Sequence, residues 1–241
     1  MEAPKQKIDR GAEFDGYADH YGAGMENPAK RLAGASPEDF LKPKIDLLAG
    51  LIDNLPESAS LLDFGCGTGG FAALIQSRWP SLGVEGCDLS EGMLDEAVRR
   101  GTTLNLWKYD GRDLPFERYD LVTAVCVFHH ICPSEWVVVA NRIRKALKPG
   151  GRFVLIEHNP WNPVTSWVVA HTAIDANAVL LSANTARRIF REAGLRTIQV
   201  QNFLFFPPRL VWLRPVDRAL GGVPLGGQYF LVAENAVRGT P

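Results

Sequence analysis

The fold of this chain is decided by the stretch Leu61-Leu62-Asp63-Phe64-Gly65-Cys66-Gly67-Thr68-Gly69-Gly70-Phe71. A short apolar run is followed by an acid, a glycine-rich turn and an amphipathic segment, a pattern that predicts a buried strand, a tight loop and a helix. Glycines suit such a loop because they let a ligand approach the backbone closely. The free N–H groups at the start of the following helix would add hydrogen-bond donors. The stretch therefore predicts a ligand-binding loop.

Two classes of cofactor use a loop of this kind, and the glycine spacing alone fits both. Gly65, Gly67 and Gly70 also satisfy the dinucleotide fingerprint, which would suit an NAD-binding oxidoreductase. Asp63 argues against that reading, because a carboxylate at the strand end would repel a pyrophosphate. The same carboxylate suits a ligand that carries an ammonium group, such as the methionine part of S-adenosylmethionine.

Residues 63–69 resemble motif I of the class I S-adenosylmethionine-dependent methyltransferases. Further features of the resemblance are Asp88, Tyr119-Asp120 and Leu147-Lys148-Pro149-Gly150-Gly151. Later segments look like a bacterial small-molecule branch of that family. The resemblance implies S-adenosylmethionine as cofactor, S-adenosylhomocysteine as product and a small-molecule substrate.

Alternating apolar runs and helical patterns after Leu61 predict an α/β fold with a doubly wound, mostly parallel sheet and helices on both faces. The resemblance implies seven strands, closed by a C-terminal antiparallel hairpin strand. We expect one domain over residues 1–241. Within it, 1–57 would form an N-terminal helical lid, 58–157 the cofactor-binding core, and 158–241 the substrate-side insertions and closing strands.

Composition excludes several other classes. The formal net charge of −1 offers no electrostatic footprint for nucleic acid or an anionic membrane. No segment approaches roughly 20 unbroken apolar residues, so we expect no integral membrane segment. The four cysteines form no C-x-x-C pair, which argues against structural zinc and favours a cytoplasmic location. We expect a monomer or a homodimer.

The ligand in a doubly wound sheet lies beyond the carboxyl ends of the strands, and residues just after each strand are candidates to bind it. Asp88 ends the second strand, where an acid can accept hydrogen bonds from ribose hydroxyls. Asp110-Gly111 follows the third strand, where the family often places an acid near the adenine amino group; a plain Asx turn is the alternative. The full set of predicted cofactor-binding residues is Tyr17, Tyr21, Asp63, Gly65, Cys66, Gly67, Gly69, Asp88, Leu89, Met93, Asp110, Gly111, Val127 and Phe128.

Three histidines are candidate general bases. His129 and His130 follow the fourth strand and His158 the fifth, and an imidazole could take a proton from a substrate hydroxyl or amine. Structural hydrogen bonding within the loops is the alternative for each. We expect no metal site, because Glu135 is the only carboxylate near the histidine pair in the sequence. Lys44 could reach the methionine carboxylate, although a solvated helix face is the default expectation.

The sequence predicts methyl transfer to oxygen or nitrogen of a small molecule by in-line displacement. The sulfonium is already activated, so the protein mainly aligns the reactants and excludes water. Two alternatives remain besides the oxidoreductase. A non-catalytic S-adenosylmethionine-binding protein would show no turnover. An enzyme for a lipid-linked or membrane-surface substrate would use the apolar stretch 203–206, which would otherwise be buried.

Overall fold

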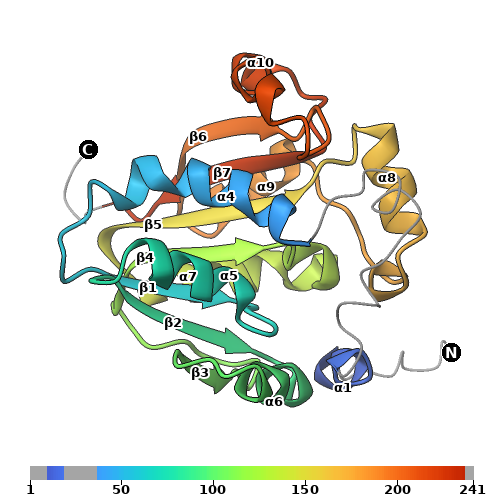
Figure 1. The fold of residues 1–241 in the computed structure, drawn as a ribbon. Helices are drawn as coiled ribbons and strands as arrows, with labels where there is room; N and C mark the ends of the chain where they lie inside the picture. The colour runs from blue at the N-terminus through green and yellow to red at the C-terminus, as the bar shows by residue number, and fades with distance from the viewer. Residues whose placement is uncertain (1–9, 19–36, 237–241) are drawn as a thin grey trace, which may run out of the picture.

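The structure is a computed structural model and describes residues 10–18 and 37–236 (Figure 1). Its centre is a seven-stranded sheet with the order β3-β2-β1-β4-β5-β7-β6. The strands are β1 (Ser60–Phe64), β2 (Gly83–Asp88), β3 (Asn105–Lys108), β4 (Tyr119–Val125), β5 (Leu147–His158), β6 (Arg196–Phe203) and β7 (Gln228–Glu234). The α-helices are α1 (Arg10–Asp15), α4 (Pro37–Ile52), α5 (Gly70–Arg78), α6 (Glu91–Arg99), α7 (Trp136–Ala146), α8 (Pro163–Ala170), α9 (Ala183–Glu192) and α10 (Arg214–Ala219).

Both faces of the sheet are covered, as the apolar strands predict. Neighbouring residues of a strand point to opposite faces, and accordingly Leu61 and Leu62 belong to different core clusters. Leu61 packs in a cluster that includes Leu48 of α4 and Ile75 of α5. Leu62 packs in a cluster that includes Ile143 of α7 and residues of α9. The prediction of a doubly wound sheet is therefore confirmed.

The last strand lies inside the sheet. β7 pairs antiparallel with β5 on one side and with β6 on the other, whereas β1 to β5 pair in parallel. The antiparallel closing hairpin implied by the resemblance is thus present. None of the helices in the described part of the chain has the length and apolar character needed to cross a bilayer.

β5 begins earlier than its sequence suggests. The pattern predicts a helix from 133 to 147 and a strand from Arg152, but α7 ends at Ala146 and β5 starts at Leu147. Residues 148–151 bulge between the Leu147–Tyr119 and Arg152–Leu121 pairs, where the register of β5 against β4 shifts. Gly150 has a φ of 78°, and a Cβ on Gly151 would lie 2.9 Å from the Lys148 carbonyl oxygen, so both positions favour glycine. The turn residues Pro149 and Gly150 therefore lie within the strand.

The apolar stretch 203–206 is buried or half-buried along its whole length. Phe203 is buried in the core, and the next three residues are half-buried. Asp217 of α10 accepts hydrogen bonds from the backbone N–H groups of Leu204 at 3.1 Å and Phe205 at 3.0 Å. Leu204 has a φ of 60°, a left-handed conformation that is unfavourable for a leucine. The carboxylate of Asp217 thus stabilises a strained turn after β6.

We expect Asp217→Ala to lower the free energy of unfolding by about 1–3 kcal/mol, because two charge-assisted hydrogen bonds to the backbone are lost. Urea unfolding followed by tryptophan fluorescence measures the change. Asp95→Ala on the exposed side of α6 is the matched control and should leave the midpoint nearly unchanged. Equal midpoints for both variants would contradict the role given to Asp217.

Candidate active site

The glycine loop between β1 and α5 adopts the conformations that its sequence predicts. Gly65, Gly67 and Gly69 all have positive φ, at 73°, 52° and 74°. The N–H groups of Gly65 and Cys66 donate to the carbonyl oxygen of Cys87 at 2.8 and 3.0 Å, which fixes the loop to the end of β2. Side chains other than glycine pay a steric cost at positive φ, so the loop depends on these residues.

Asp88 organises the loop from the end of β2. Its carboxylate accepts hydrogen bonds from the N–H groups of Gly67 at 2.8 Å and Ser90 at 2.9 Å. Ser90 in turn caps α6 by accepting a hydrogen bond from the N–H of Met93 at 3.1 Å. Burial raises the pKa of Asp88, and these backbone hydrogen bonds oppose that shift. Asp88 therefore already holds the loop in place without a ligand.

Three of the predicted cofactor-binding residues, Leu89, Met93 and Asp110, lie in different surroundings. Leu89 is 39% exposed, and its Cδ2 lies 3.8 Å from the position of a Cβ on Gly111, so these two residues are neighbours. Met93 is only 2% exposed and belongs to the protein interior. Asp110 is exposed and accepts a hydrogen bond from the N–H of Arg112 at 2.9 Å, which is the Asx turn given as the alternative.

Asp63 is a buried carboxyl group at the end of β1. Its side chain is 2% exposed and accepts a hydrogen bond from the Thr123 hydroxyl at 2.8 Å. Burial raises its pKa to about 7, although the Thr123 hydrogen bond and the charge of Lys44 act in the opposite direction. A cation placed beside this group would favour its ionised form.

Asp63 should make stability fall with rising pH. In the unfolded chain its pKa is about 3.9, so between roughly pH 4 and 7 the folded protein holds the proton that the unfolded chain has lost. The free energy of unfolding therefore decreases over this range. We expect Asp63→Asn to remove that decrease and to be more stable relative to wild type at pH 8 than at pH 5, by about 1–2 kcal/mol.

Calorimetric melting without cofactor at pH 5 and pH 8 measures this difference. Asp95→Asn, on the exposed side of α6, is the control and should show no such pH dependence. A difference in melting temperature between Asp63→Asn and wild type that is the same at both pH values would contradict the assignment.

Cys126 lies beside Lys44, a contact that the sequence did not predict. Cys126 follows β4 directly and has a φ of 58°, an unfavourable conformation of the kind that clusters at functional sites. Lys44 reaches it from α4, with Nζ 3.9 Å from Sγ. The lysine is only 5% exposed, so the expectation of a solvated helix face was wrong. Burial opposes ionisation of the thiol, but Lys44 and His158 together lower its pKa to about 7.

His158 lies beside this pair. Gln228 of β7 donates to Cys126 Sγ at 3.4 Å, and its Nε2 is also 3.4 Å from His158 Nδ1. The Gln228 side-chain oxygen is buried without a hydrogen-bond partner among the described residues. Polar groups from β4, β5, β7 and α4 thus meet at the carboxyl edge of the sheet.

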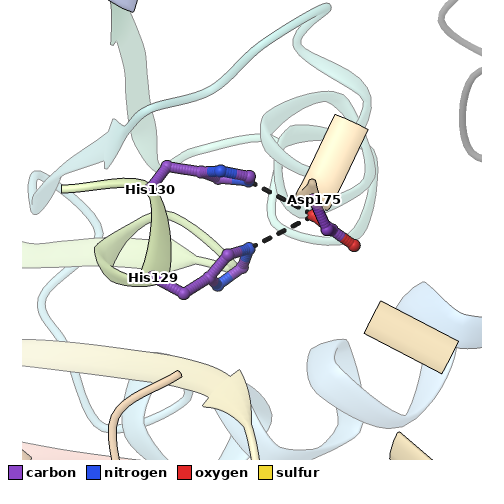
Figure 2. A group of neighbouring side chains, drawn as sticks. All are labelled: His129, His130 and Asp175. Atoms are coloured by element: carbon purple, nitrogen blue, oxygen red, sulfur yellow. Dashed lines mark ion pairs between the residues drawn. The ribbon is translucent and has the colours of Figure 1, made fainter. Parts of the chain in front are cut away.

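His129 is held between two carboxylates. Its Nδ1 lies 2.5 Å from Glu157 Oε2 and its Nε2 lies 3.5 Å from Asp175 Oδ1 (Figure 2). Burial opposes the charged form, but the two acids outweigh it and raise the pKa of His129 to about 10. His129 is 1% exposed and charged at neutral pH, so this geometry argues against it as a general base.

His130 points to the same acid. Its Nε2 lies 3.4 Å from Asp175 Oδ1, and its ring meets Phe14 of α1 edge-on at 4.9 Å. Burial and the positive charge of His129 lower the pKa of His130 to about 3. His130 is therefore neutral at physiological pH, but a weak base.

Val127 and Phe128 take different positions. A Cβ on Gly65 would lie 2.6 Å from Val127 Cγ2, so Val127 directly adjoins the glycine loop. The ring of Phe128 is fully buried against Phe153 and Phe190, in the core cluster that covers the far side of β4. The ring of Phe128 occupies the core and its backbone N–H donates to Glu157 at 2.6 Å, so a contact of Phe128 with cofactor stays a prediction.

α1 lies beside α6, at the end of the sheet that holds β2 and β3 (Figure 1). The Asp15 carboxylate accepts hydrogen bonds from the Ser90 hydroxyl at 2.5 Å and the Gly92 N–H at 2.9 Å. The Tyr17 hydroxyl donates to the Ala173 carbonyl at 3.2 Å, across 156 residues of sequence. Tyr17 therefore lies where the predicted lid would be, whereas Tyr21 lies outside the described residues.

Residues 61–151 match a family model described as "Methyltransferase domain". Residues 61–151 of the chain form a methyltransferase domain. The match runs from β1 into β5 and so includes the glycine loop, Asp63 and Asp88. The predicted family and its cofactor, S-adenosylmethionine, are confirmed at this level.

Curated relatives of the methyltransferase domain are named for different acceptors, such as ribosomal RNA and, in Arabidopsis thaliana, a thiol. Ribosomal RNA small subunit methyltransferase C of Hahella chejuensis is 32% identical over 130 residues, which are 50% of this chain and 38% of the relative. The first three curated relatives are matched over 38%, 44% and 57% of their own lengths, so the chain spans about half of each.

Solved structures share the fold over most of the chain. A methyltransferase in complex with the Haloferax volcanii activator Trm112 has a TM-score of 0.65 at 21% identity and covers 93% of this chain and 98% of its own. The geranyl diphosphate C-methyltransferase of Streptomyces coelicolor, solved with Mg²⁺, geranyl diphosphate and S-adenosylhomocysteine, has a TM-score of 0.63 at 18% identity and covers 89% and 88%. Both likenesses extend the methyltransferase fold beyond residues 61–151.

Proposed function

We propose that this protein transfers the methyl group of S-adenosylmethionine to an oxygen or nitrogen atom of a small molecule. Asp63 carries the proposal. Its carboxyl group is 2% exposed at the end of β1, directly before the glycine loop, and this burial raises its pKa to about 7. The ammonium group of the methionine moiety would supply a cationic partner, and Asp88 would accept hydrogen bonds from the ribose hydroxyls.

The surrounding residues suit in-line displacement more than acid–base chemistry. The sulfonium leaves as a neutral thioether, so alignment of nucleophile, methyl carbon and sulfur and exclusion of water supply much of the catalysis. His129 is ion-paired and buried, which leaves His158 as the predicted base with the most favourable position, next to Cys126. Where the acceptor is already a good nucleophile, no base is required.

Hydrogen bonds between the N-terminal segment 10–18 and the chain after α8 support a small acceptor. Contacts of Glu13 and Tyr17 with residues of the segment 173–177 tie α1 to the chain that follows α8. The net charge of −1 also gives no general attraction for RNA, although one relative acts on ribosomal RNA. The free thiols of all four cysteines agree with the proposed cytoplasmic location. A monomer or homodimer remains our proposal for the assembly.

Calorimetric titration with S-adenosylmethionine, S-adenosylhomocysteine and NAD tests the cofactor. We expect micromolar binding of the first two, none of NAD, and proton release on binding at pH 6, where Asp63 is largely protonated. The released proton should disappear in Asp63→Asn. NAD binding alone would overturn the proposal.

Methyl-labelled S-adenosylmethionine tests the acceptor. The protein is incubated with a bacterial extract that has been separated into low-molecular-weight, RNA and protein fractions. Label in the low-molecular-weight fraction supports the proposal, and label confined to RNA or protein contradicts it. Binding of cofactor with no transfer to any fraction would favour a non-catalytic binding protein.

One surface feature favours a second candidate, a lipid-linked or membrane-surface acceptor. Trp161 and Val164 are each 65% exposed and Trp167 is 46% exposed, all at or near α8 beside the carboxyl edge. Aromatic side chains of this kind can insert at a membrane interface. Co-sedimentation of the protein with anionic vesicles, and loss of that binding in Trp161→Ser, would support this candidate. If the protein stays in the supernatant whether or not vesicles are present, this candidate is excluded.

A further inference from the structure

Three side chains from two distant parts of the chain lie close together. His129 and His130 lie on the 3-10 helix η2 (Phe128–His130), and Asp175 comes from η4 (Ala173–Asp175), where their polar atoms lie within 4.8 Å of one another (Figure 2). In the sequence, Glu135 is the only carboxylate close to the histidine pair. Asp175 lies far along the chain and is brought here by the segment after α8.

The spacing of these atoms suits a small tetrahedral ion. Asp175 Oδ1 lies 3.5 Å from His129 Nε2 and 3.4 Å from His130 Nε2. Two ligands that each lie about 2.0–2.1 Å from a tetrahedral Zn²⁺ ion are about 3.3 Å apart. The two separations that involve Asp175 are close to this value, and all three atoms lie within 4.8 Å of one another.

His129 has the orientation of a metal ligand. Its Nδ1 faces Glu157 Oε2 at 2.5 Å, so Nε2 is the ring nitrogen directed at the cluster. Metal-ligating histidines almost always donate their second ring N–H to a carboxylate or carbonyl, which fixes the ring. Glu157 is itself fixed, because it accepts hydrogen bonds from the N–H groups of Val127 at 2.9 Å and Phe128 at 2.6 Å.

The nitrogen directed at the cluster is an independent sign of a ligand. His129 Nε2 is buried in a side chain that is 1% exposed, and its polar neighbour among the described residues is Asp175 Oδ1 at 3.5 Å, a contact too long and poorly aligned to count as a hydrogen bond. A buried polar atom without a hydrogen-bond partner is costly in a native structure. The two other groups are more open, with side-chain exposures of 19% for His130 and 12% for Asp175. An ion could enter from their side.

We propose that His129 Nε2, His130 Nε2 and Asp175 Oδ1 bind a divalent transition metal, with Zn²⁺ as the ion. Two imidazoles and one carboxylate suit Zn²⁺ better than Mg²⁺ or Ca²⁺, which prefer oxygen ligands. Three protein ligands leave a fourth position of the tetrahedron for water or a substrate oxygen. Glu157 acts as the positioning residue that orients His129.

Metal titration of the full chain tests the site without any assay of activity. Protein stripped with a chelator is titrated with Zn²⁺ in competition with a chromophoric chelator, with Mg²⁺ as the comparison ion. We expect one equivalent of Zn²⁺ to bind and no competition from Mg²⁺. Asp175→Asn and His130→Gln should each weaken Zn²⁺ binding at least about tenfold, and Glu157→Gln about 10–100-fold.

Asp113→Asn is the matched control, since Asp113 is exposed and lies outside the cluster. It should bind Zn²⁺ as wild type does, and thermal melting checks that every variant is folded. Binding below one equivalent, or equal binding by wild type and a folded Asp175→Asn, would overturn the proposal and leave His129 as an ion-paired structural residue. This result is independent of the proposed methyl transfer, because cofactor is absent from the titration.

Discussion

Gly65→Ala should destabilise the protein by about 2–5 kcal/mol, because the new methyl group meets two separate costs. A Cβ at this position would lie 2.6 Å and 2.9 Å from the two methyl groups of Val127, too close for any ordinary contact. The φ of 73° adds about 1–2 kcal/mol for any residue with a Cβ. Overpacking of this kind costs about 1–3 kcal/mol. Urea unfolding of the purified variant gives the total.

A double-mutant cycle with Val127→Ala separates the two costs. Removing the valine methyl groups relieves the clash and leaves the backbone strain, so the double variant should regain stability relative to Gly65→Ala alone. Gly50→Ala is the control, because Gly50 lies in the last turn of α4, where a Cβ meets nothing within 4 Å, and we expect this exchange to stabilise the protein by up to about 1 kcal/mol. Additive effects of Gly65→Ala and Val127→Ala would show that the clash is relieved elsewhere.

Asp88→Ala should weaken binding of S-adenosylmethionine by roughly 2–4 kcal/mol. The carboxylate binds the N–H groups of Gly67 and Ser90, so its loss frees the glycine loop in addition to removing ribose acceptors. Calorimetric titration measures the affinity. Asp95→Ala, the same exchange on the exposed side of α6, should bind as wild type does.

Asp88→Asn distinguishes the two contributions. An amide oxygen can still accept from one of the two N–H groups, so the loop should be partly retained while the charge is lost. We expect an affinity between those of wild type and Asp88→Ala. Equal affinity in all three proteins would remove Asp88 from the cofactor site.

The sheet and its glycine loop could be predicted because their signals are local. Apolar strands alternate with helical patterns, and the residues from Asp63 to Gly70 are contiguous, so sequence alone places them at the end of β1. The Ser90 cap is likewise set by a residue three positions away. Such features need no knowledge of the tertiary fold.

The missed residues depend on contacts between distant segments. Lys44 meets Cys126 across 82 residues, and Asp175 meets His129 through a loop with no motif of its own. One signal was available: Cys126 directly follows a buried strand, where ligand-binding residues gather. No comparable signal marks Asp175, because an aspartate in a turn is an ordinary surface residue, and nothing in the sequence places the candidate Lys44 beside Cys126.

The interior position of β7 has a consequence for synthesis of the protein. β6 has no partner in the sheet except β7, and β7 also covers the open edge of β5. On the ribosome, β5 and β6 are therefore complete while the strand that joins them is still to be made, and both expose unpaired backbone groups during that time. Folding of this half of the sheet must wait for residues 228–234, so a premature stop codon before them would yield an aggregation-prone chain rather than a shortened enzyme.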